Sequence, residues 1–195
     1  MRYPKDHKKQ ARAAILATAA HTLKEKGFQG VGVDGLAASA QVTSGALYSH
    51  FGSKEAFLEQ VVDAQLGAEF TVVDDPDPAE RRRRLVEFLG VYLSDDHRED
   101  VAHGCVMPAL SADVSRAGDS VREAYQRRVL DVVALLAPAM QGTAEEREER
   151  AWAMVAAMVG AVTLARALPA GEQAKSVLDA VLQATRKAVT DSPAA

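Results

Sequence analysis

The chain of 195 residues is 48% apolar and 26% charged, with a formal charge of -4. These values are typical of a folded protein with one or two domains, and they exclude a disordered, collagen-like or disulfide-rich chain. Because Cys105 is the only cysteine, an internal disulfide and an all-cysteine metal site are excluded as well. An aromatic content of 5%, together with abundant alanine, favours an all-α fold.

Positive charge is concentrated in the N-terminal part of the chain. Residues 1–60 hold eight Lys and Arg against five Asp and Glu, a net charge of +3, whereas the remainder carries -7. Five of the cations fall within the first twelve residues: Arg2, Lys5, Lys8, Lys9 and Arg12. This pattern is typical of an arm that lies along a phosphate backbone, and a solvated chain end is the alternative.

Two apolar segments resemble membrane or export signals. Residues 151–165 are almost uninterrupted apolar, but the run stops at Arg166, short of the ~20 residues that a membrane span requires. The stretch AAILATAA near the N-terminus is short and rich in alanine, and it continues into Lys24 and Lys26, unlike a signal peptide. We therefore expect a buried helix at 151–165, no membrane partner and a cytoplasmic location.

In the first third of the chain, apolar residues at helical spacing predict helices over 6–26, 33–40, 44–50 and 54–70. Gly27 is placed to end the first helix in a left-handed conformation. Thr43 and Ser53 are placed to cap the third and fourth.

Further along the chain, the pattern predicts a helix over 78–93 that Asp77 caps, a polar loop over 94–102, and a short helix over 103–116. Longer helices follow over 120–136, 144–168 and 172–189, the second opened by a capping box at 143–146. The four consecutive arginines at 81–84 are expected to form salt bridges on a solvated face. The count is about nine helices, with no strand pattern.

The helices over 33–40 and 44–50, joined by a short turn, are a candidate helix-turn-helix motif. A recognition helix enters the major groove by its N-terminal end, and the small residues Ser44, Gly45 and Ala46 allow that approach. Tyr48 and His50 carry polar groups that can reach phosphates or base edges. Lys54 stands at the positive end of the next helix and faces the same backbone.

The TetR family of bacterial transcriptional repressors has a DNA-binding domain that resembles the segment GFQGVGVDGLAASAQVTSGALYSHFGSKEAFLEQV, preceded by ARAAILATAAHTLKEKG. The resemblance covers about residues 9–69. It includes an apolar first helix, a Gly-aromatic connection, a Leu-Ala pair, and Leu-Tyr-x-x-Phe followed by a small residue, Ser and Lys.

The resemblance implies a set of DNA-contacting residues in the turn and recognition helix, with a phosphate-binding lysine after them. With the neighbouring Ala46 and Ser49, the candidate DNA-binding residues are Thr43, Ser44, Gly45, Ala46, Tyr48, Ser49, His50 and Lys54. The family often opens its second helix with a Thr or Ser that contacts phosphate, but Gly32 and Val33 stand there, so that contact is lost or moved. Since Ala46 offers no hydrogen bond to a base, specificity depends on few side chains and on DNA shape.

Family members are all-α homodimers of nine helices, and the resemblance implies the same here. It implies a DNA-binding domain over 1–55 and an effector-binding and dimerisation domain over 56–195, entered by a linking helix over 54–70. The partners would be double-stranded operator DNA, a second copy of the chain and an unidentified small-molecule effector. Within the Ala-rich helix, Ala153, Ala157, Gly160 and Ala161 allow close helix approach, across a dimer interface or inside one subunit.

An apolar effector cavity would draw on aromatic, thioether and a few polar side chains of the C-terminal region. The candidates are Phe88, Tyr92, His103, Cys105, Met107, Tyr125, Trp152, Val155 and Met158. Cys105 next to His103 also raises the alternative of a thiol that senses oxidants or electrophiles, against that of a small buried hydrophobe. We expect no metal, no cofactor and no enzyme activity, because no nucleophile and base lie at catalytic spacing; a helical-bundle enzyme is the remote alternative.

Overall fold

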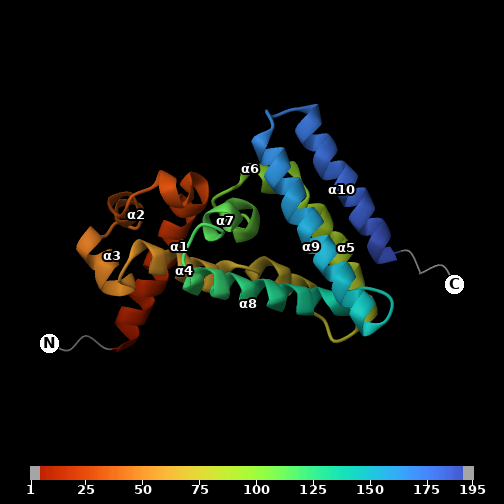
Figure 1. The fold of residues 1–195 in the computed structure, drawn as a ribbon, viewed down its shortest axis with the longest axis horizontal. Helices are drawn as coiled ribbons and strands as arrows, with labels where there is room; N and C mark the ends of the chain where they lie inside the picture. Colours follow the sequence, from red (N-terminus) through yellow and green to blue (C-terminus); the bar gives the residue numbers. More distant parts are fainter. Residues whose placement is uncertain (1–4, 191–195) are drawn as a thin grey trace. The chain divides into compact units, whose positions relative to one another are not determined.

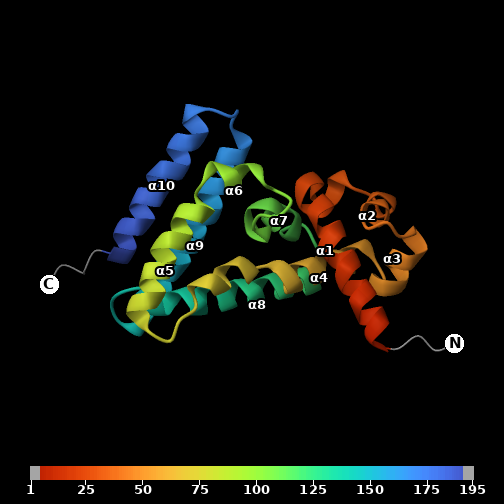
Figure 2. The ribbon, with the colours of Figure 1, turned by 180° about the vertical axis from the view of Figure 1, so that it is seen from behind.

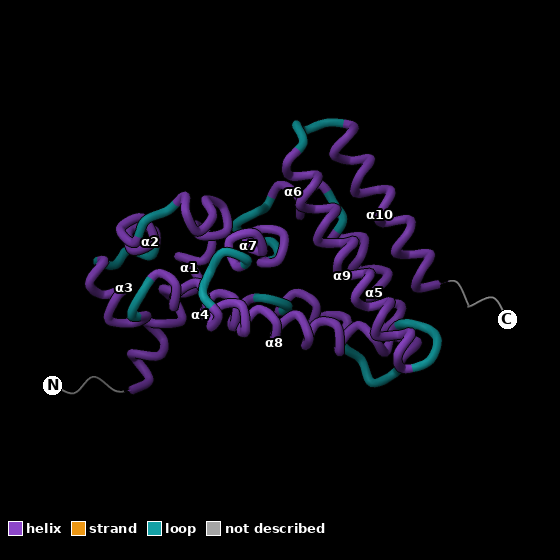
Figure 3. Tube along the Cα trace, viewed as in Figure 1, coloured by secondary structure: helices purple, strands orange, loops and turns teal. Residues whose placement is uncertain are grey.

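The computed structural model describes residues 5–190, with side chains from residue 8 onward. Arg2 and the side chain of Lys5, both part of the basic N-terminal segment, lie outside the described part. Within that part every regular element is a helix and none is a strand, which confirms the all-α prediction (Figure 3). The helices form two compact units, each made of two stretches of the chain.

The first unit comprises residues 1–66 and 101–126. Its helices are α1 (Lys5–Gly30), α2 (Val33–Ser39), α3 (Ser44–Phe51), α4 (Lys54–Gln65), α7 (Val106–Val114) and the beginning of α8 (Asp119–Leu136). Helix α1 packs against α2, α4 and α7, and α3 packs against both α2 and α4 (Figure 1). The predicted apolar face of α1 is buried in this core, at Ile15, Ala19 and Leu23.

The second unit comprises residues 67–100 and 127–195. Besides the rest of α8, it contains η1 (Ala68–Val73), α5 (Pro78–Tyr92), α6 (Asp95–Glu99), η2 (Ala137–Ala139), α9 (Ala144–Ala167) and α10 (Glu172–Thr190). Figure 2 shows α5, α9 and α10 packed together, and both α5 and α9 contact α10. The predicted apolar positions of α5 are buried here, including Leu85 and Leu89.

Helix caps explain why most elements begin where the sequence predicts. Thr43, Ser53 and Asp77 each accept a hydrogen bond from a backbone N–H in the first turn of the helix that follows. Thr143 and Glu146 form the reciprocal capping box that opens α9. Such caps satisfy N–H groups that lack a partner inside the helix, so a polar residue at that position is a local signal.

Several predicted boundaries are wrong, among them that of the helix expected over 103–116, which is α7 (Val106–Val114). Instead of one helix over 54–70, α4 ends at Gln65, Gly67 adopts a left-handed φ of 84°, and η1 follows. The loop expected over 94–102 contains the short helix α6, which Ser94 caps. Gly27 breaks the helical conformation as predicted, with φ 71°, but a further helical turn to Gly30 follows it.

The four arginines at 81–84 are engaged within the unit, as predicted. Arg81 and Arg84 form ion pairs of 2.6 and 2.7 Å with Asp74 and Asp75, while Arg83 lies between two glutamates of its own helix. Hydrogen bonds from Arg83 and Arg84 lower the pKa of the Glu80 carboxyl to about 2. Arg82 donates to the Ala139 carbonyl at 3.2 Å. Carboxylates and a carbonyl of the same unit therefore engage the run, which is not presented as a patch for an anion.

Helix α9 is long and apolar enough, by length and composition alone, to cross a membrane. The same test is passed by core helices of proteins that lie in water. Within the second unit α9 buries Met154, Met158 and Val162, and it packs against α10. This arrangement agrees with the buried helix expected over 151–165.

Candidate nucleic-acid interface

The turn between α2 and α3 is tight and closed by backbone hydrogen bonds. The N–H groups of Gln41 and Val42 donate to carbonyls in the last turn of α2, each at 3.0 Å. Gln41 adopts φ 57°, a left-handed conformation that few residues other than glycine take up. Thr43 then caps α3, its hydroxyl accepting from the Ala46 N–H at 3.1 Å. These contacts hold the start of α3 in a defined direction.

One face of α3 is buried and the other is open. Leu47 is fully buried and Phe51 is 6% exposed, its ring meeting that of Phe57 edge-on at 5.0 Å between centroids. On the open side, Gly45 and Ser49 are exposed and the Tyr48 side chain is 49% exposed. A phenol that is half in solvent contributes little to the core, so Tyr48 is free to contact a partner.

The hydroxyl of Ser44, a predicted DNA-contacting residue, donates to the Asp34 carboxylate in the first turn of α2. Asp34 is exposed, so a negative charge stands beside the first residue of α3. A Cβ added at Gly45 would meet only the Thr43 hydroxyl, at 3.8 Å, and packing inside the chain does not require glycine there. Ala46 is half-buried. The first turn of α3 therefore offers backbone and small side chains, with the Asp34 carboxylate of α2 beside them.

Lys54, the predicted phosphate-binding lysine, makes contacts within its own unit. Its ammonium donates to the Phe28 carbonyl and stands 4.2 Å from the centre of the Phe28 ring. An ammonium over an aromatic face is attracted by the ring quadrupole. Since a lysine ammonium has three N–H donors, two remain for a phosphate. Lys54 thus ties the start of α4 to the last turn of α1.

His50 closes the last turn of α3 and is half-buried. Its backbone carbonyl accepts a hydrogen bond from the Arg12 guanidinium of α1. Its ring nitrogen Nδ1 is buried, with no hydrogen-bond partner among the described residues. The structure therefore places Gly45, Tyr48 and Ser49 on the exposed side of α3 and leaves Ser44, Ala46 and His50 half-buried, with a cation of α1 joined to the helix.

The predicted effector residues are divided between the two units. His103, Cys105, Met107 and Tyr125 belong to the first unit, and Phe88, Tyr92, Trp152, Val155 and Met158 to the second. In the second unit Phe88 and Tyr92 cluster with Phe70, ring centroids 4.9 to 5.7 Å apart, in a buried aromatic group. The Trp152 side chain is 41% exposed, so within one chain it lies at the surface.

Cys105 is buried and stands at the N-cap of α7, where its sulfur accepts from the Met107 N–H at 3.4 Å. The adjoining Gly104 carbonyl accepts a hydrogen bond of 3.0 Å from the ammonium of Lys24, which is itself only 6% exposed. Burial raises the pKa of the nearby Tyr125 phenol, while its hydrogen bond with Ser111 acts in the opposite direction. Cys105 thus lies at the N-terminus of α7, next to a backbone carbonyl that a buried ammonium binds.

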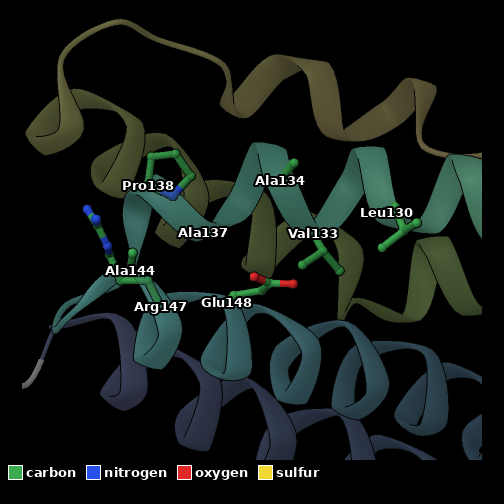
Figure 4. A pocket seen from close by; sticks show the side chains of 8 residues that line it. All are labelled: Leu130, Val133, Ala134, Ala137, Pro138, Ala144, Arg147 and Glu148. Atoms are coloured by element: carbon green, nitrogen blue, oxygen red, sulfur yellow. The ribbon is translucent and has the colours of Figure 1, made fainter.

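The structure adds a groove of about 410 Å³ that the sequence did not indicate as a site (Figure 4). Figure 4 shows Leu130, Val133 and Ala134 along α8, and Arg147 with Glu148 on the facing turn of α9. Positions 130, 133, 134 and 137 share one helix face, and that spacing was the available signal. A second groove of about 470 Å³ runs between η1 and α5 and includes Phe88, one of the predicted effector residues.

Comparison with known proteins agrees with the geometry of the first unit. Residues 15–61 match the family model of bacterial regulatory proteins of the tetR family. The chain is 28% identical over 137 residues to the HTH-type transcriptional repressor NemR of Escherichia coli K12, covering 69% of each protein. It is 33% identical over 103 residues to the HTH-type transcriptional repressor DhaR of Mycobacterium sp. GP1, covering 50% of this chain and 49% of DhaR.

Solved structures share the fold. The reduced form of Escherichia coli NemR superposes with a TM-score of 0.76 at 22% identity, covering 95% of this chain and 100% of that one. A TetR-family regulator from Agrobacterium tumefaciens gives a TM-score of 0.73 at 16% identity, covering 94% and 100%. At these identities the likeness shows a common arrangement of helices.

Proposed function

We propose that this chain, which belongs to the TetR family of bacterial transcriptional regulators, is a repressor that binds palindromic operator DNA as a homodimer. A small, largely apolar effector releases it, and the protein acts in the cytoplasm, where the DNA is. The observation that carries the proposal is the open side of α3: Leu47 and Phe51 anchor the helix while Tyr48, Gly45 and Ser49 face outward. An anchored helix with a small, exposed first turn is what entry into a major groove requires.

The outer side of α9 supports a homodimer. Trp152 and Leu164 are 41% and 60% exposed, and Ala153 and Ala156 are exposed as well. An exposed row of apolar and small side chains on a long helix is typical of an interface with another protein chain. Of the four small residues singled out by the sequence, Ala161 is buried within its own unit and Gly160 is open. The row is therefore available to a second copy.

An effector would act by differential binding. It would select a dimer in which the two recognition helices no longer match successive major grooves, and only a higher affinity for that state can shift the population. A coupling of about 1–3 kcal/mol reduces operator affinity ~5- to 150-fold. The groove of α8 and α9 in Figure 4, apolar with Arg147 and Glu148 at its edge, suits a ligand of this kind.

The direct test is footprinting of the purified protein on the DNA upstream of its own gene. We expect protection of a palindrome whose half-sites lie ~34–36 Å apart, because each recognition helix of a dimer reads one groove of the same face. Binding should weaken when compounds from an apolar library are added. A monomer on an asymmetric site, or protection without sequence preference, would contradict the proposal.

A second candidate function is sensing of oxidants or electrophiles at Cys105. Two observations favour it: the sulfur sits at the N-terminus of α7, and the buried ammonium of Lys24 is bound to the neighbouring Gly104 carbonyl. Cys105→Ser separates the two triggers. If release by electrophiles disappears while release by a non-reactive ligand survives, both routes exist. If oxidants release the protein from DNA and no apolar compound does, the proposal of a reversibly bound effector is wrong.

A further inference from the structure

The first unit contains a cleft of about 410 Å³ that brings cations of the N-terminal segment together with two of the candidate DNA-binding residues. Its walls come from the beginning of α1 and the end of α3, and the lining residues are Lys8, Lys9, Arg12, Ser49 and His50. Three of these five are cations, one carries a hydroxyl and one an imidazole, and none of the described lining residues is a carboxylate. Such a set of donors is complementary to an anion.

Among the residues whose side chains the structure describes, no carboxylate neutralises the charges of this cleft. Lys8 and Lys9 are exposed, and within residues 8–190 neither ammonium has an ion-pair partner. This distinguishes them from Arg81, Arg83 and Arg84, which are paired with carboxylates of their own unit. The His50 ring makes no hydrogen bond with a described residue, so no carboxylate competes with an anion there.

Arg12 holds the two walls together. Its guanidinium donates to the His50 carbonyl at the end of α3 and lies 4.7 Å from the centre of the Phe51 ring. These contacts fix the guanidinium in place. Because the group is planar and rigid, the directions of its remaining N–H groups are fixed as well. A preorganised cation loses less conformational entropy on binding than a free lysine does. The cleft therefore combines one fixed cation with two mobile ones.

We propose that this cleft seats a phosphate of the DNA backbone, a contact separate from those of the first turn of α3 and of Lys54. The inference rests on the proposed function, because it takes α3 to lie in the major groove. Ser49 lies five residues beyond Ser44, about 7.5 Å along the helix axis. A helix that enters the groove by its first turn has its last turn at the groove edge, where the phosphates run.

The contact is expected to be independent of sequence. Phosphate contacts position a protein on DNA, and each neutralised phosphate contributes about 0.9 to the slope of log affinity against log salt concentration. One such phosphate per protomer predicts that loss of the cleft flattens this slope by about 2 for the dimer. Affinity at moderate salt should fall about tenfold or more, on operator and random DNA alike.

The test compares the wild type with Lys8→Ser/Lys9→Ser by titrating an operator duplex between about 50 and 200 mM salt. Lys26→Ser/Lys175→Ser is the matched control, because it removes the same charge from two exposed lysines elsewhere. Lys26 stands 17 residues beyond Lys9, about 25 Å further along α1. We expect the flatter slope in the cleft variant alone, and equal thermal unfolding in all three proteins.

A second arm locates the phosphate. Single phosphates of the operator are replaced, one at a time, by neutral methylphosphonates. Replacement of the phosphate that the cleft binds should lower the operator affinity of the wild type and leave that of the Lys8→Ser/Lys9→Ser variant unchanged. If the wild type binds the operator and the cleft variant keeps both its salt slope and its sensitivity at every position, the inference is wrong.

The remaining outcomes separate the inference from the proposed function. If the wild type binds no DNA at all, the proposed function fails. Titration with inorganic phosphate, followed by NMR of the histidine rings, then decides the chemistry of the cleft. If the wild type binds inorganic phosphate and the cleft variant does not, the cleft is a site for free phosphate and the DNA assignment is overturned. If the wild type does not bind inorganic phosphate either, the lysines are merely solvated.

Discussion

Gly160, near the middle of α9, offers a direct test of the dimer. Apart from its own stretch of helix, a Cβ added at this position would meet no described atom within 4 Å, so packing inside the chain does not require glycine. Glycine inside a helix is less stable than alanine by about 1 kcal/mol. Trp152, Ala156 and Leu164 lie on the same side of α9 and are exposed. The open space beside Gly160 therefore allows a second helix to approach closely.

Two substitutions separate the effect on the helix from the effect on the interface. Gly160→Ala and Gly160→Arg both replace glycine with a good helix former, so each should raise the unfolding temperature of an isolated chain by about 2–4 °C. Helices that pack closely lie about 8–10 Å apart, which leaves no room for an arginine side chain. In a two-fold interface each substitution occurs twice. We expect Gly160→Arg to raise the dimer dissociation constant at least about 100-fold, or 2.7 kcal/mol.

Sedimentation over a range of protein concentrations measures this constant directly. Gly160→Ala should remain a dimer, and Gly160→Arg should sediment as a folded monomer whose unfolding temperature no longer depends on concentration. Operator affinity should fall in the arginine variant alone. A Gly160→Arg protein that sediments as a dimer with the wild-type constant would refute the reasoning and place the interface on another surface.

Two further predictions concern residues whose contacts the structure defines. Gly67→Ala should destabilise the protein by about 2–4 kcal/mol, because φ is 84° and the new Cβ would lie 2.6 Å from a Val132 methyl carbon. In the Val132→Ala background the same change should have a smaller effect, and an equal effect in chemical unfolding would show that the clash is absent. Lys54→Met should lower stability by about 1–2 kcal/mol and flatten the salt dependence of DNA binding, since Lys54 holds Phe28 as well as facing phosphate. Phe28→Leu should lower stability but leave the salt slope unchanged, and a Lys54→Met protein of wild-type stability would contradict the double role.

Local signals in the sequence predicted the elements of the fold well. Each cap, such as Thr43 or Thr143, is a contact within four residues, so the residue type at that position determines it. The break at Gly67 was missed because one glycine in an apolar, periodic run is compatible with a continuing helix. Helix α6 was missed since five residues are too few to show a period.

The candidate site could be predicted only as far as its residues depend on local structure. The order of small residues and of Tyr48 in the recognition helix is visible in the sequence, and the structure leaves that side open. The partners of these residues are set by long-range packing, as with Phe28 for Lys54 and His50 for Arg12. The effector residues were chosen by side-chain type alone, and nothing in a sequence reports which of them lie in the same unit.

The carboxylate of Asp34 yields a further prediction about specificity. Asp34 is exposed in the first turn of α2 and accepts a hydrogen bond from the hydroxyl of Ser44, the first residue of the recognition helix. A carboxylate at this position repels phosphates. In the major groove it can accept a hydrogen bond from the amino group of cytosine. A protein gains discrimination when a group disfavours incorrect partners more than correct ones. The charge of Asp34 is thus expected to weaken binding to random DNA.

Asp34→Asn keeps the size and one acceptor oxygen for Ser44 but removes the charge. Two unit charges 4 Å apart in water interact by about 1 kcal/mol, so affinity for random DNA should rise about fivefold at low salt. The operator complex should gain less, because it loses the contact to cytosine, and the ratio of operator to random affinity should fall. Titration of an operator and a scrambled duplex at two salt concentrations measures both values, with Asp34→Glu as the variant that retains the charge. If the asparagine variant and the wild type bind both duplexes equally, Asp34 lies away from the DNA and its carboxylate serves only to hold Ser44 against α2.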